Sequence, residues 1–379
     1  MKLTDISNDI NEWFSGSGPL ADVVISSRIR LARNLAGHKF LTRCTVKEKS
    51  EILENLRDVI MSLQLGEKIF YISVDKAPAL DRHFMVERHL ISRHHAFGKG
   101  PRGVVIAQGE FFTAMINEED HLRIQVLKGG SQLSKCAEHI NRIDNMIEKK
   151  VEFAFSSRYG YLTACPTNLG TGIRVSVMLH LPALKITGQI EKFLNAAKDM
   201  NLAVRGLFGE GTEAAGDFYQ LSNHATLGVS ETDIVHQFED MIIPEIVEYE
   251  NAARKQLLSN QADILDDKIS RAMALLKNAR LISSQEALFL LSHLRLGLNI
   301  RTNMGVHIPA IDRLFAGKRG RQKTTDSEAF SIRTINRLFM LTQPAHLQLN
   351  YGKSLDPTHR DALRAKIIRS ALNQNANKT

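Results

Sequence analysis

The sequence contains little cysteine and no long apolar run. Its three cysteines, Cys44, Cys136 and Cys165, are an odd number and lie far apart. They exclude a disulfide framework and a CxxC metal site, and they favour a reducing cytoplasm. The apolar stretch 286–298 is interrupted by polar residues and is shorter than the roughly 20 residues of a membrane span. Acidic residues stand near the N-terminus where a signal peptide needs an apolar core. We therefore expect a cytoplasmic protein with no membrane segment and no metal motif.

The common nucleotide-binding loops are also missing. The P-loop pattern fails at Gly352-Lys353-Ser354, because Leu347 stands where its first glycine should be. His359-Arg360-Asp361 imitates the catalytic loop of protein kinases, but Lys366 occupies the position of its asparagine. The glycines between 209 and 216 do not form GxGxxG. The sequence thus supports neither of these kinase folds.

The composition is that of a folded protein. Of its 379 residues 43% are hydrophobic and 24% are charged, which excludes a disordered or fibrous chain. The length suits two or three domains. The formal net charge of +8 fits anionic ligands from a nucleotide to a nucleic acid and selects none of them.

The chain divides into three parts. Residues 1–22 are a short lead-in, residues 23–253 mix strands with helices, and residues 254–379 are helical. In the middle part, short β-type runs at hairpin distance predict a largely antiparallel sheet; they span 102–107, 111–116, 122–127, 159–164, 174–181 and 202–208. The fold class is therefore α+β.

Local signals locate several helices. Thr45-x-x-Glu48 is a capping box, and apolar residues at alternating spacings of three and four predict a helix from Leu133 to Ile147. In the last part, Ser283-x-x-Glu286 caps a helix and Asp356-Pro357 opens another. The polar and basic stretch at 303–329 predicts an exposed loop between helices.

Arginines stand within the predicted strands rather than in loops. Arg28 and Arg30 share one face of an extended segment, and Arg123, Arg174 and Arg205 lie in three other strands. Any one of them alone would be a solvated or ion-paired edge residue. Together they suit phosphate oxygens, which guanidinium groups bind with two parallel hydrogen bonds.

Two acidic turns and one unusual loop accompany these arginines. The turn 117–120 contains Glu118 and Glu119, and the turn 210–213 follows the Arg205 strand. Taken singly, each is equally a solvated hairpin tip. Cys165 opens the string CPTNLGTG (165–172), although a lone cysteine is more often a small buried hydrophobe.

The same residues carry a family resemblance. SSRIR (26–30), NEEDHLRIQ (117–125), CPTNLGTG (165–172) and RGLFGEGTEAAG (205–216) resemble the phosphagen kinase family, the ATP:guanidino phosphotransferases, in order and spacing. This resemblance implies a phosphagen-kinase-like catalytic domain over residues 23–253, with a largely antiparallel sheet flanked by helices. An all-helical domain then follows.

The C-terminal part is similar to that of one branch, the bacterial protein-arginine kinases. Only 22 residues precede the catalytic domain, where animal family members carry a helical domain. The branch's RDxxRA motif is present as Arg360, Asp361, Arg364 and Ala365, and the resemblance implies phosphoarginine binding there and dimerisation through the helical domain. From the residues alone, either an anion clamp or an Asp361–Arg364 ion pair would explain the motif.

The resemblance assigns the site residues. It implies that Glu119 is the catalytic base, that Glu213 is a second guanidinium clamp, that Glu118 assists, and that Cys165 orients the guanidinium as a thiolate. A base is needed because full deprotonation of a guanidinium at pH 7 would cost roughly 9 kcal/mol. The implied cofactors are ATP and Mg²⁺. The implied ATP-binding residues are Ser26, Ser27, Arg28, Ile29, Arg30, His89, Arg123, Arg174, Val175, Ser176, Val177, Met178, Arg205, Gly206, Leu207, Phe208, Gly209 and Glu210.

The expected function is phosphorylation of arginine side chains on proteins, which marks them for regulation or Clp-dependent degradation. Expected partners are protein substrates, an activator protein, a Clp-type ATPase or protease, and a second copy of the chain. Two alternatives stay open: a kinase for free arginine or another small guanidino compound, and a catalytically inactive phosphoarginine-binding adaptor. Direct nucleic-acid binding through GKRGRQK (317–323) is not expected, because no aromatic platform accompanies it.

Overall fold

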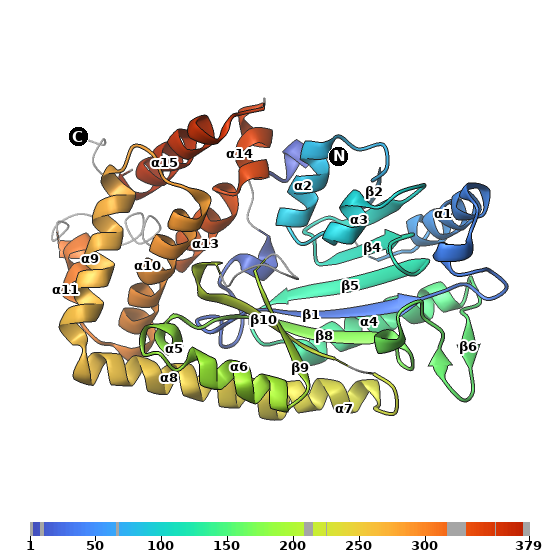
Figure 1. The fold of residues 1–379 in the computed structure, drawn as a ribbon, viewed down its shortest axis with the longest axis horizontal. Helices are drawn as coiled ribbons and strands as arrows, with labels where there is room; N and C mark the ends of the chain where they lie inside the picture. Colours follow the sequence, from blue (N-terminus) through green and yellow to red (C-terminus); the bar gives the residue numbers. More distant parts are fainter. Residues whose placement is uncertain are drawn as a thin grey trace.

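An antiparallel sheet of eight strands forms the centre of the part of the chain up to α8 (Ile243–Asn260) (Figure 1). The computed structural model describes residues 3–7, 11–65, 68–207, 215–224, 226–316, 331–352 and 354–373. The strand order is β2-β3-β4-β5-β1-β8-β10-β9. The strands are β1 (Val24–Arg33), β2 (Ile69–Ser73), β3 (Gly103–Ala107), β4 (Phe112–Ile116), β5 (Leu122–Gly129), β8 (Ile173–His180), β9 (Leu202–Gly206) and β10 (Phe218–Asn223). Every neighbouring pair is antiparallel, which confirms the predicted sheet.

One predicted strand is largely wrong. Of residues 159–164, only Gly160–Tyr161 form a strand, β7, which pairs with β6 (Phe155–Ser156) in a small separate hairpin. The backbone beyond it bonds elsewhere: the Leu162 N–H donates to Ala154 O, and the Ala164 N–H donates to an Asp120 carboxylate oxygen at 2.6 Å. Side-chain and loop acceptors thus replace a strand partner.

Helices cover one face of the sheet and, at its β2–β4 end, part of the other face, where α2 (Ala79–Glu87) and α3 (Arg93–Phe97) pack on Val104, Ile106 and Met115. Helix α4 (Leu133–Glu148) packs its apolar stripe on β1 and β5, and α1 (Val46–Met61) packs beside β2, β3 and β4. The predicted capping box at α1 is present, with Thr45 and Glu48 each accepting a hydrogen bond from the other's backbone N–H. The other helices of this part are α5 (Pro182–Ile186), α6 (Ile190–Asp199), α7 (Glu231–His236) and α8.

The C-terminal part is helical, as predicted, and lies beside the sheet (Figure 1). Its helices are α9 (Ala262–Asn278), α10 (Ser284–Met304), α11 (Pro309–Ala316), α13 (Ile332–Leu341), α14 (Pro344–Tyr351) and α15 (Pro357–Asn373). Ser283 caps α10 by accepting the Glu286 N–H. The prediction of a loop over 303–329 is wrong for part of that range, since α10 runs to Met304 and α11 follows. Buried Ile308 and Ile311 hold α11 against the bundle, and residues 317–330 lie outside the described residues.

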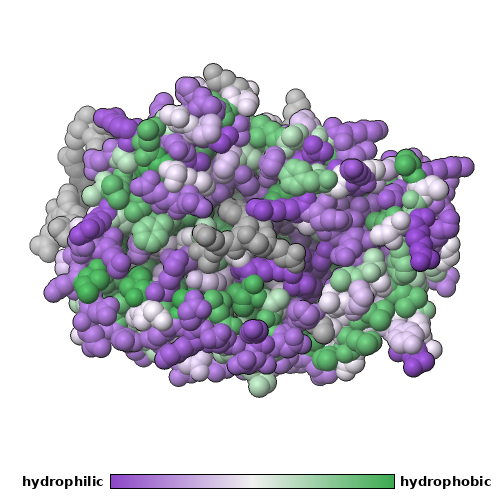
Figure 2. All heavy atoms as spheres, in the orientation of Figure 1, coloured by the Kyte–Doolittle hydropathy of each residue, from purple (hydrophilic) through white to green (hydrophobic). Residues whose placement is uncertain are grey.

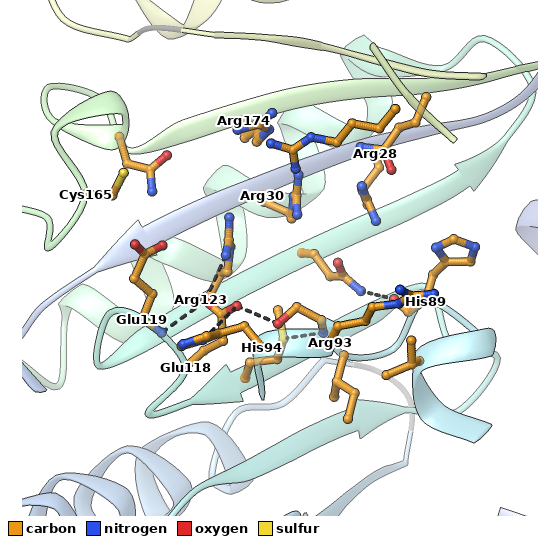
Figure 3. A pocket seen from close by; sticks show the side chains of 18 of the residues that line it. Arg28, Arg30, His89, Arg93, His94, Glu118, Glu119, Arg123, Cys165 and Arg174 are labelled. Atoms are coloured by element: carbon orange, nitrogen blue, oxygen red, sulfur yellow. Dashed lines mark hydrogen bonds and ion pairs between the residues drawn. The ribbon is translucent and has the colours of Figure 1, made fainter. Parts of the chain in front are cut away.

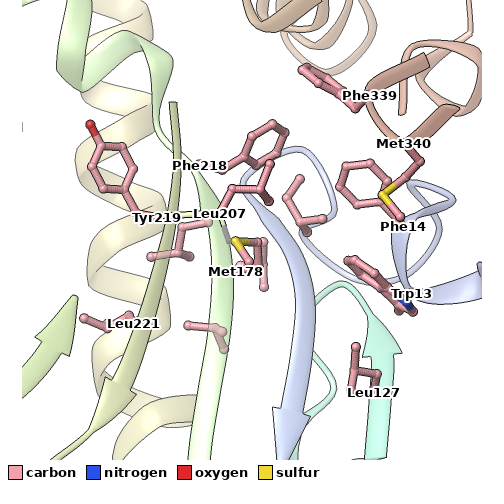
Figure 4. Close-up of a cluster of buried hydrophobic side chains, with 14 of the residues drawn as sticks. Trp13, Phe14, Leu127, Met178, Leu207, Phe218, Tyr219, Leu221, Phe339 and Met340 are labelled. Carbon is pink, nitrogen blue, oxygen red and sulfur yellow. The ribbon is translucent and has the colours of Figure 1, made fainter. Parts of the chain in front are cut away.

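The N-terminal lead-in belongs to the core. Trp13 and Phe14 are 3% and 1% exposed, and they lie between the sheet and the helical part (Figure 4). The Phe14 ring contacts Phe218 of β10 and Phe339 of α13, at centroid distances of 6.0 and 6.3 Å. Residues from the two ends of the chain thus share one apolar cluster with the sheet.

Two i,i+4 ion pairs in neighbouring helices provide a matched stability test. Arg254 in α8 pairs with Glu250, and the two side chains are 1% and 0% exposed. Arg271 in α9 pairs with Asp267, and both are exposed. We expect Arg254→Ala to lower the free energy of unfolding by about 3–5 kcal/mol, because it leaves a buried carboxylate without its cation. Arg271→Ala should change it by less than about 0.5 kcal/mol. Urea unfolding of both variants measures the difference, and equal effects would contradict the argument.

Candidate active site

A pocket of about 550 Å³ opens on the sheet face opposite α4. It brings together nine of the residues predicted for the site: Arg28, Arg30, His89, Glu118, Glu119, Arg123, Cys165, Arg174 and Arg205. In Figure 3, Glu119 and Cys165 lie at one end, His89 lies at the other, and the arginines lie between them. The pocket therefore has an acidic end with a thiol and a long basic floor.

Strand register explains why the arginines converge. Successive side chains of a strand point to opposite faces, so Arg28 and Arg30 face the pocket while Ile29 between them is buried in the core. In the β1–β8 ladder Arg30 stands opposite Arg174. Like charges placed directly opposite one another are unfavourable in a sheet. An anion bound between the two guanidinium groups would relieve this repulsion.

The arginine floor, which consists of Arg28, Arg30, Arg123, Arg174 and Arg205, carries more positive charge than the two glutamates of the pocket can neutralise. Burial, followed by repulsion from neighbouring arginines, lowers the pKa of Arg28 to about 9 and that of Arg30 well below its ordinary value. The Arg30 Nε and one terminal nitrogen are buried and have no hydrogen-bond partner among the described residues. Hydrogen-bond donors left unsatisfied in this way fit the oxygens of a phosphate chain.

The Glu118 carboxylate already has two hydrogen-bond partners within the protein. It accepts a hydrogen bond from Arg123 at 2.8 Å and another from the Ser92 hydroxyl at 2.5 Å. Burial alone would raise its pKa, but the Arg123 charge and the Ser92 hydrogen bond outweigh burial and lower the pKa to about 2. Glu118 is therefore an ionised anchor for Arg123.

Glu119 differs from its neighbour. Its carboxylate is half-buried and makes no hydrogen bond or ion pair within the described ranges, although its backbone N–H donates to Glu118. Burial, and then repulsion by Glu118, raise its pKa above the ordinary value. A free carboxylate with a raised pKa is suited to accept a proton.

The turn that carries both glutamates is rigid. Asn117 adopts a left-handed backbone (φ 61°), and its side-chain amide donates to Lys49 O and Pro101 O. Asp120, at the end of the turn, accepts the Ala164 N–H, one residue before Cys165. This bond fixes the acidic turn to the loop 165–172. The Cys165 sulfur lies 3.0 Å from the Thr167 hydroxyl and faces the same end of the pocket.

The His89 end continues toward the N-terminal lead-in. A small adjoining hollow is lined by Trp13, Ser26, Arg28, His89, Leu127, Ser176, Val177, Met178 and Gln220. Burial, together with Arg28 and Arg30, lowers the pKa of His89 to about 3, so the imidazole is neutral. The Trp13 ring meets it edge-on at 5.3 Å. A neutral, partly aromatic end beside cationic groups suits a heteroaromatic base attached to phosphates.

Other predicted residues do not line these spaces. Ile29 and Val175 are buried in the core, and the Ser27 hydroxyl is bonded to Gly130 O and the Gln132 N–H. Gly206 and Leu207 are buried and line neither space. Phe208, Gly209, Glu210 and Glu213 lie outside the described residues.

The sequence did not identify several lining residues. These are Val86, Ile91, Ser92, Arg93, His94, Met115, Gln125, Thr167, Asn168 and Gln220, with Trp13 and Leu127 in the hollow. Strand alternation could have found Gln125, which shares a face with Arg123. Alternation applies also to Leu127 in β5 and Met115 in β4, whereas Gln220 lies in β10, a strand that the sequence did not predict. The remaining residues enter from loops and helices, whose direction strand alternation does not encode.

The RDxxRA motif lies in α15, away from the pocket. Arg364 is 1% exposed, and it donates to Thr342 O at 2.8 Å, Ile282 O at 2.7 Å and the Asp361 carboxylate at 2.5 Å. Arg360 donates to Leu355 O, and Ala365 is buried. The ion pair allowed by the sequence is thus present, and the Arg364 guanidinium joins three segments of the helical part.

The described residues contain neither a cluster of metal ligands nor a membrane-spanning helix. Within the described ranges, no three His, Cys, Asp or Glu side chains gather closely enough to hold a metal ion. None of the described helices has the length and apolar character needed to cross a bilayer.

Comparisons with known proteins agree with this geometry. The family model of the ATP:guanido phosphotransferase C-terminal catalytic domain matches residues 30–253, and that of the protein-arginine kinase McsB C-terminal domain matches 262–319 and 327–379. A solved lombricine kinase is similar in fold, with a TM-score of 0.55 and 27% identity over 65% of this chain and 72% of that one. A duplicated taurocyamine kinase from Schistosoma mansoni gives a TM-score of 0.57 and 28% identity over 62% of this chain and 34% of that one. Fold and pocket thus define an ATP:guanido phosphotransferase.

Full-length relatives narrow the class. A protein-arginine kinase from Halothermothrix orenii is 41% identical over 98% of this chain and 100% of its own length. Another from Symbiobacterium thermophilum is 40% identical over 97% of this chain and 98% of its own. The chain belongs to the protein-arginine kinase family.

Proposed function

We propose that this enzyme transfers the γ-phosphate of ATP to the guanidinium groups of arginine side chains on proteins. The observation that carries the proposal is the single pocket in which Glu119 and Cys165 face a floor of five arginines. Carboxylates select a cationic acceptor, and the arginines select an anionic donor. The family's protein-arginine kinases support a polypeptide as the acceptor.

The arginine floor would hold the phosphate chain of ATP, and the His89 end of the 550 Å³ pocket would hold its base. Phosphoryl transfer depends mainly on positioning and charge neutralisation, and a cluster of preorganised guanidinium groups provides both. Mg²⁺ would be bound chiefly by the phosphates, where it would neutralise further charge. The Nε and Nη2 atoms of Arg30, which have no hydrogen-bond partner among the described residues, would donate to phosphate oxygens.

Glu119 would take the acceptor's proton. A guanidinium nitrogen becomes nucleophilic only as it loses a proton, and Glu119 offers a free carboxylate for it. Cys165 would orient the acceptor from the opposite side, and Glu213 would complete the clamp. Glu118 would assist indirectly by holding Arg123 in place, at 2.8 Å.

The proposal extends to the roles of the two parts of the chain, its location and its partners. We infer that residues 23–253 form the catalytic domain and that 254–379 bind phosphoarginine through RDxxRA and mediate dimerisation. We further infer a cytoplasmic location, an activator protein, and a Clp-type ATPase or protease that receives the marked substrates.

Product analysis tests the proposal directly. Purified enzyme would be incubated with Mg-ATP and a mixed protein substrate, and in parallel with free arginine, and phosphate would be mapped by mass spectrometry under non-acidic handling. We expect phosphoarginine on protein. Phosphorylation of free arginine alone would instead indicate a metabolite kinase. No transfer, together with tight binding of a phosphoarginine peptide, would indicate an adaptor.

A further inference from the structure

Three loops form a continuous rim beside the acidic end of the pocket. They are the β6–β7 hairpin (155–161), the loop 165–172, and the segment 226–229. Tyr161 and Gly170 exchange backbone hydrogen bonds at 2.7 and 3.4 Å, and the Thr226 hydroxyl donates to Leu169 O at 2.7 Å. Cys165 and Thr167 of the middle loop line the pocket. The rim therefore begins where the acceptor end of the pocket stops.

The rim carries large exposed apolar side chains. Phe155, Tyr159, Leu227 and Val229 are 62%, 43%, 55% and 44% exposed. Figure 2 shows hydrophobic atoms gathered at the lower right, over the region of the hairpin and of the segment before α7. Contiguous exposed apolar side chains next to a binding pocket are typical of an interaction site.

Close packing fixes the shape of the rim. A Cβ on Gly160 would lie 2.4 Å from Gly170 O, and a Cβ on Gly170 would meet Thr226 O at 3.0 Å and the Leu227 Cα at 3.1 Å. Both glycines have positive φ, at 71° and 111°. The three loops can approach this closely only because these positions lack side chains. A preorganised surface of this kind loses little freedom when it binds a partner.

The hairpin is also anchored through its aromatic residues. The Phe155 ring contacts Tyr161 at 5.3 Å, and Tyr161 stacks on the Arg33 guanidinium at 3.6 Å. Arg33 is buried and bonded to Asp144 of α4 at 2.7 Å. This chain of contacts connects an exposed phenyl ring to the sheet core, so Phe155 is held outward on a firm base.

We propose that this rim binds the substrate polypeptide on either side of the target arginine and prefers apolar or aromatic side chains there. The inference rests on the proposed function, since it takes the acidic end of the pocket as the acceptor end. An extended chain advances about 3.3 Å per residue. Since Cys165 and Thr167 of the rim line the same pocket as Glu119, residues a few positions from an arginine that reaches Glu119 would lie over the rim. The site would select arginines within partly apolar, accessible segments.

Two peptides and two triple variants test the rim. Each peptide has one arginine, flanked at positions three to six on both sides by Leu and Phe in one peptide and by Ser and Gly in the other. The rim variant is Phe155→Ser, Tyr159→Ser and Leu227→Ser. The control variant removes similarly exposed side chains outside the rim loops: Met241→Ser in the π-helical segment 237–242, Tyr249→Ser in α8 and Leu275→Ser in α9.

We expect the wild type and the control to favour the apolar peptide by about tenfold or more in kcat/KM. The rim variant should treat both peptides alike, with the polar peptide unchanged within about twofold. Single substitutions at Phe155 or Leu227 should each remove part of the preference. Because a single substitution at an exposed position perturbs the fold little, these variants test the rim even if the triple variant misfolds.

Binding separates this inference from the proposed function. Fluorescence anisotropy of labelled peptides gives the affinity ratio without any turnover. Equal affinities in the wild type, or an undiminished ratio in the rim variant, would overturn the rim even if arginine is phosphorylated. If the wild type binds the apolar peptide more tightly, the rim variant loses this difference, and no phosphoarginine forms, the result would support the rim and count against the proposed activity. Light scattering provides one more check: a rim variant that dissociates into single chains would make the rim a contact between copies and overturn the inference.

Discussion

Replacement of Glu119 by glutamine should lower kcat for arginine phosphorylation by about 10²–10⁴-fold and leave ATP binding nearly unchanged. The amide keeps the size of the side chain but cannot accept the acceptor's proton. Because the Glu119 carboxylate has no partner among the described residues, its loss leaves no buried charge unpaired. The variant should therefore fold normally, and a thermal melt should confirm it.

Glu118→Gln is the matched control. Glu118 holds Arg123 at 2.8 Å, so its loss should disturb the arginine floor and raise the KM for ATP more than it lowers kcat. Steady-state kinetics of both variants measure the split. A kcat loss confined to Glu118→Gln would transfer the role of base to that residue.

The pH dependence gives a second measurement on Glu119. Its pKa is raised, first by burial and then by Glu118, and a base acts only when it is deprotonated. The wild-type kcat/KM, which reports the free enzyme, should therefore fall as the pH drops through a value above the ordinary glutamate pKa of about 4.3. The residual rate of Glu119→Gln should lack this acid limb. An unchanged limb in the variant would assign it to another group.

Strand alternation made much of the pocket predictable. A period of two places Arg28 with Arg30, and Arg123 with Gln125, on one face, and charged residues on such faces must meet either solvent or a ligand. The starts of α1 and α10 were also predictable, from their capping residues Thr45 and Ser283. A capping side chain bonds the backbone two or three residues away, so its effect can be inferred from the local sequence.

Features that depend on distant contacts could not be predicted. Trp13 reaches His89 at the edge of the pocket only because residues 11–22 fold back between the sheet and α13. The neighbouring Phe14–Phe339 contact spans more than three hundred residues. Ser92 and His94 enter the pocket from a short helix. Residues 159–164 have the composition of a strand, but Asp120 takes the backbone N–H of Ala164 and ends the pairing. Tertiary partners overrode local preference in each case.

Arg30→Met should change stability and activity in opposite directions. The Arg30 guanidinium is buried opposite Arg174, and two of its nitrogens have no partner among the described residues. Its removal relieves repulsion and unsatisfied donors, so we expect the unliganded enzyme to gain about 1–3 kcal/mol in free energy of unfolding. Arginine phosphorylation should fall by about 10²–10³-fold, because a preorganised donor to the transferring phosphate is lost.

Thermal unfolding with and without Mg-ATP measures both effects. At 100 times its Kd, a ligand stabilises the native state by about 2.7 kcal/mol, and this gain should shrink in Arg30→Met because its affinity for ATP is lower. Arg142→Met, on the exposed side of α4, should leave both stability and ATP-induced stabilisation unchanged. Destabilisation by Arg30→Met would mean that its guanidinium serves the fold. Stabilisation with lost activity would show that the enzyme maintains a repulsive floor for the sake of the phosphates it binds.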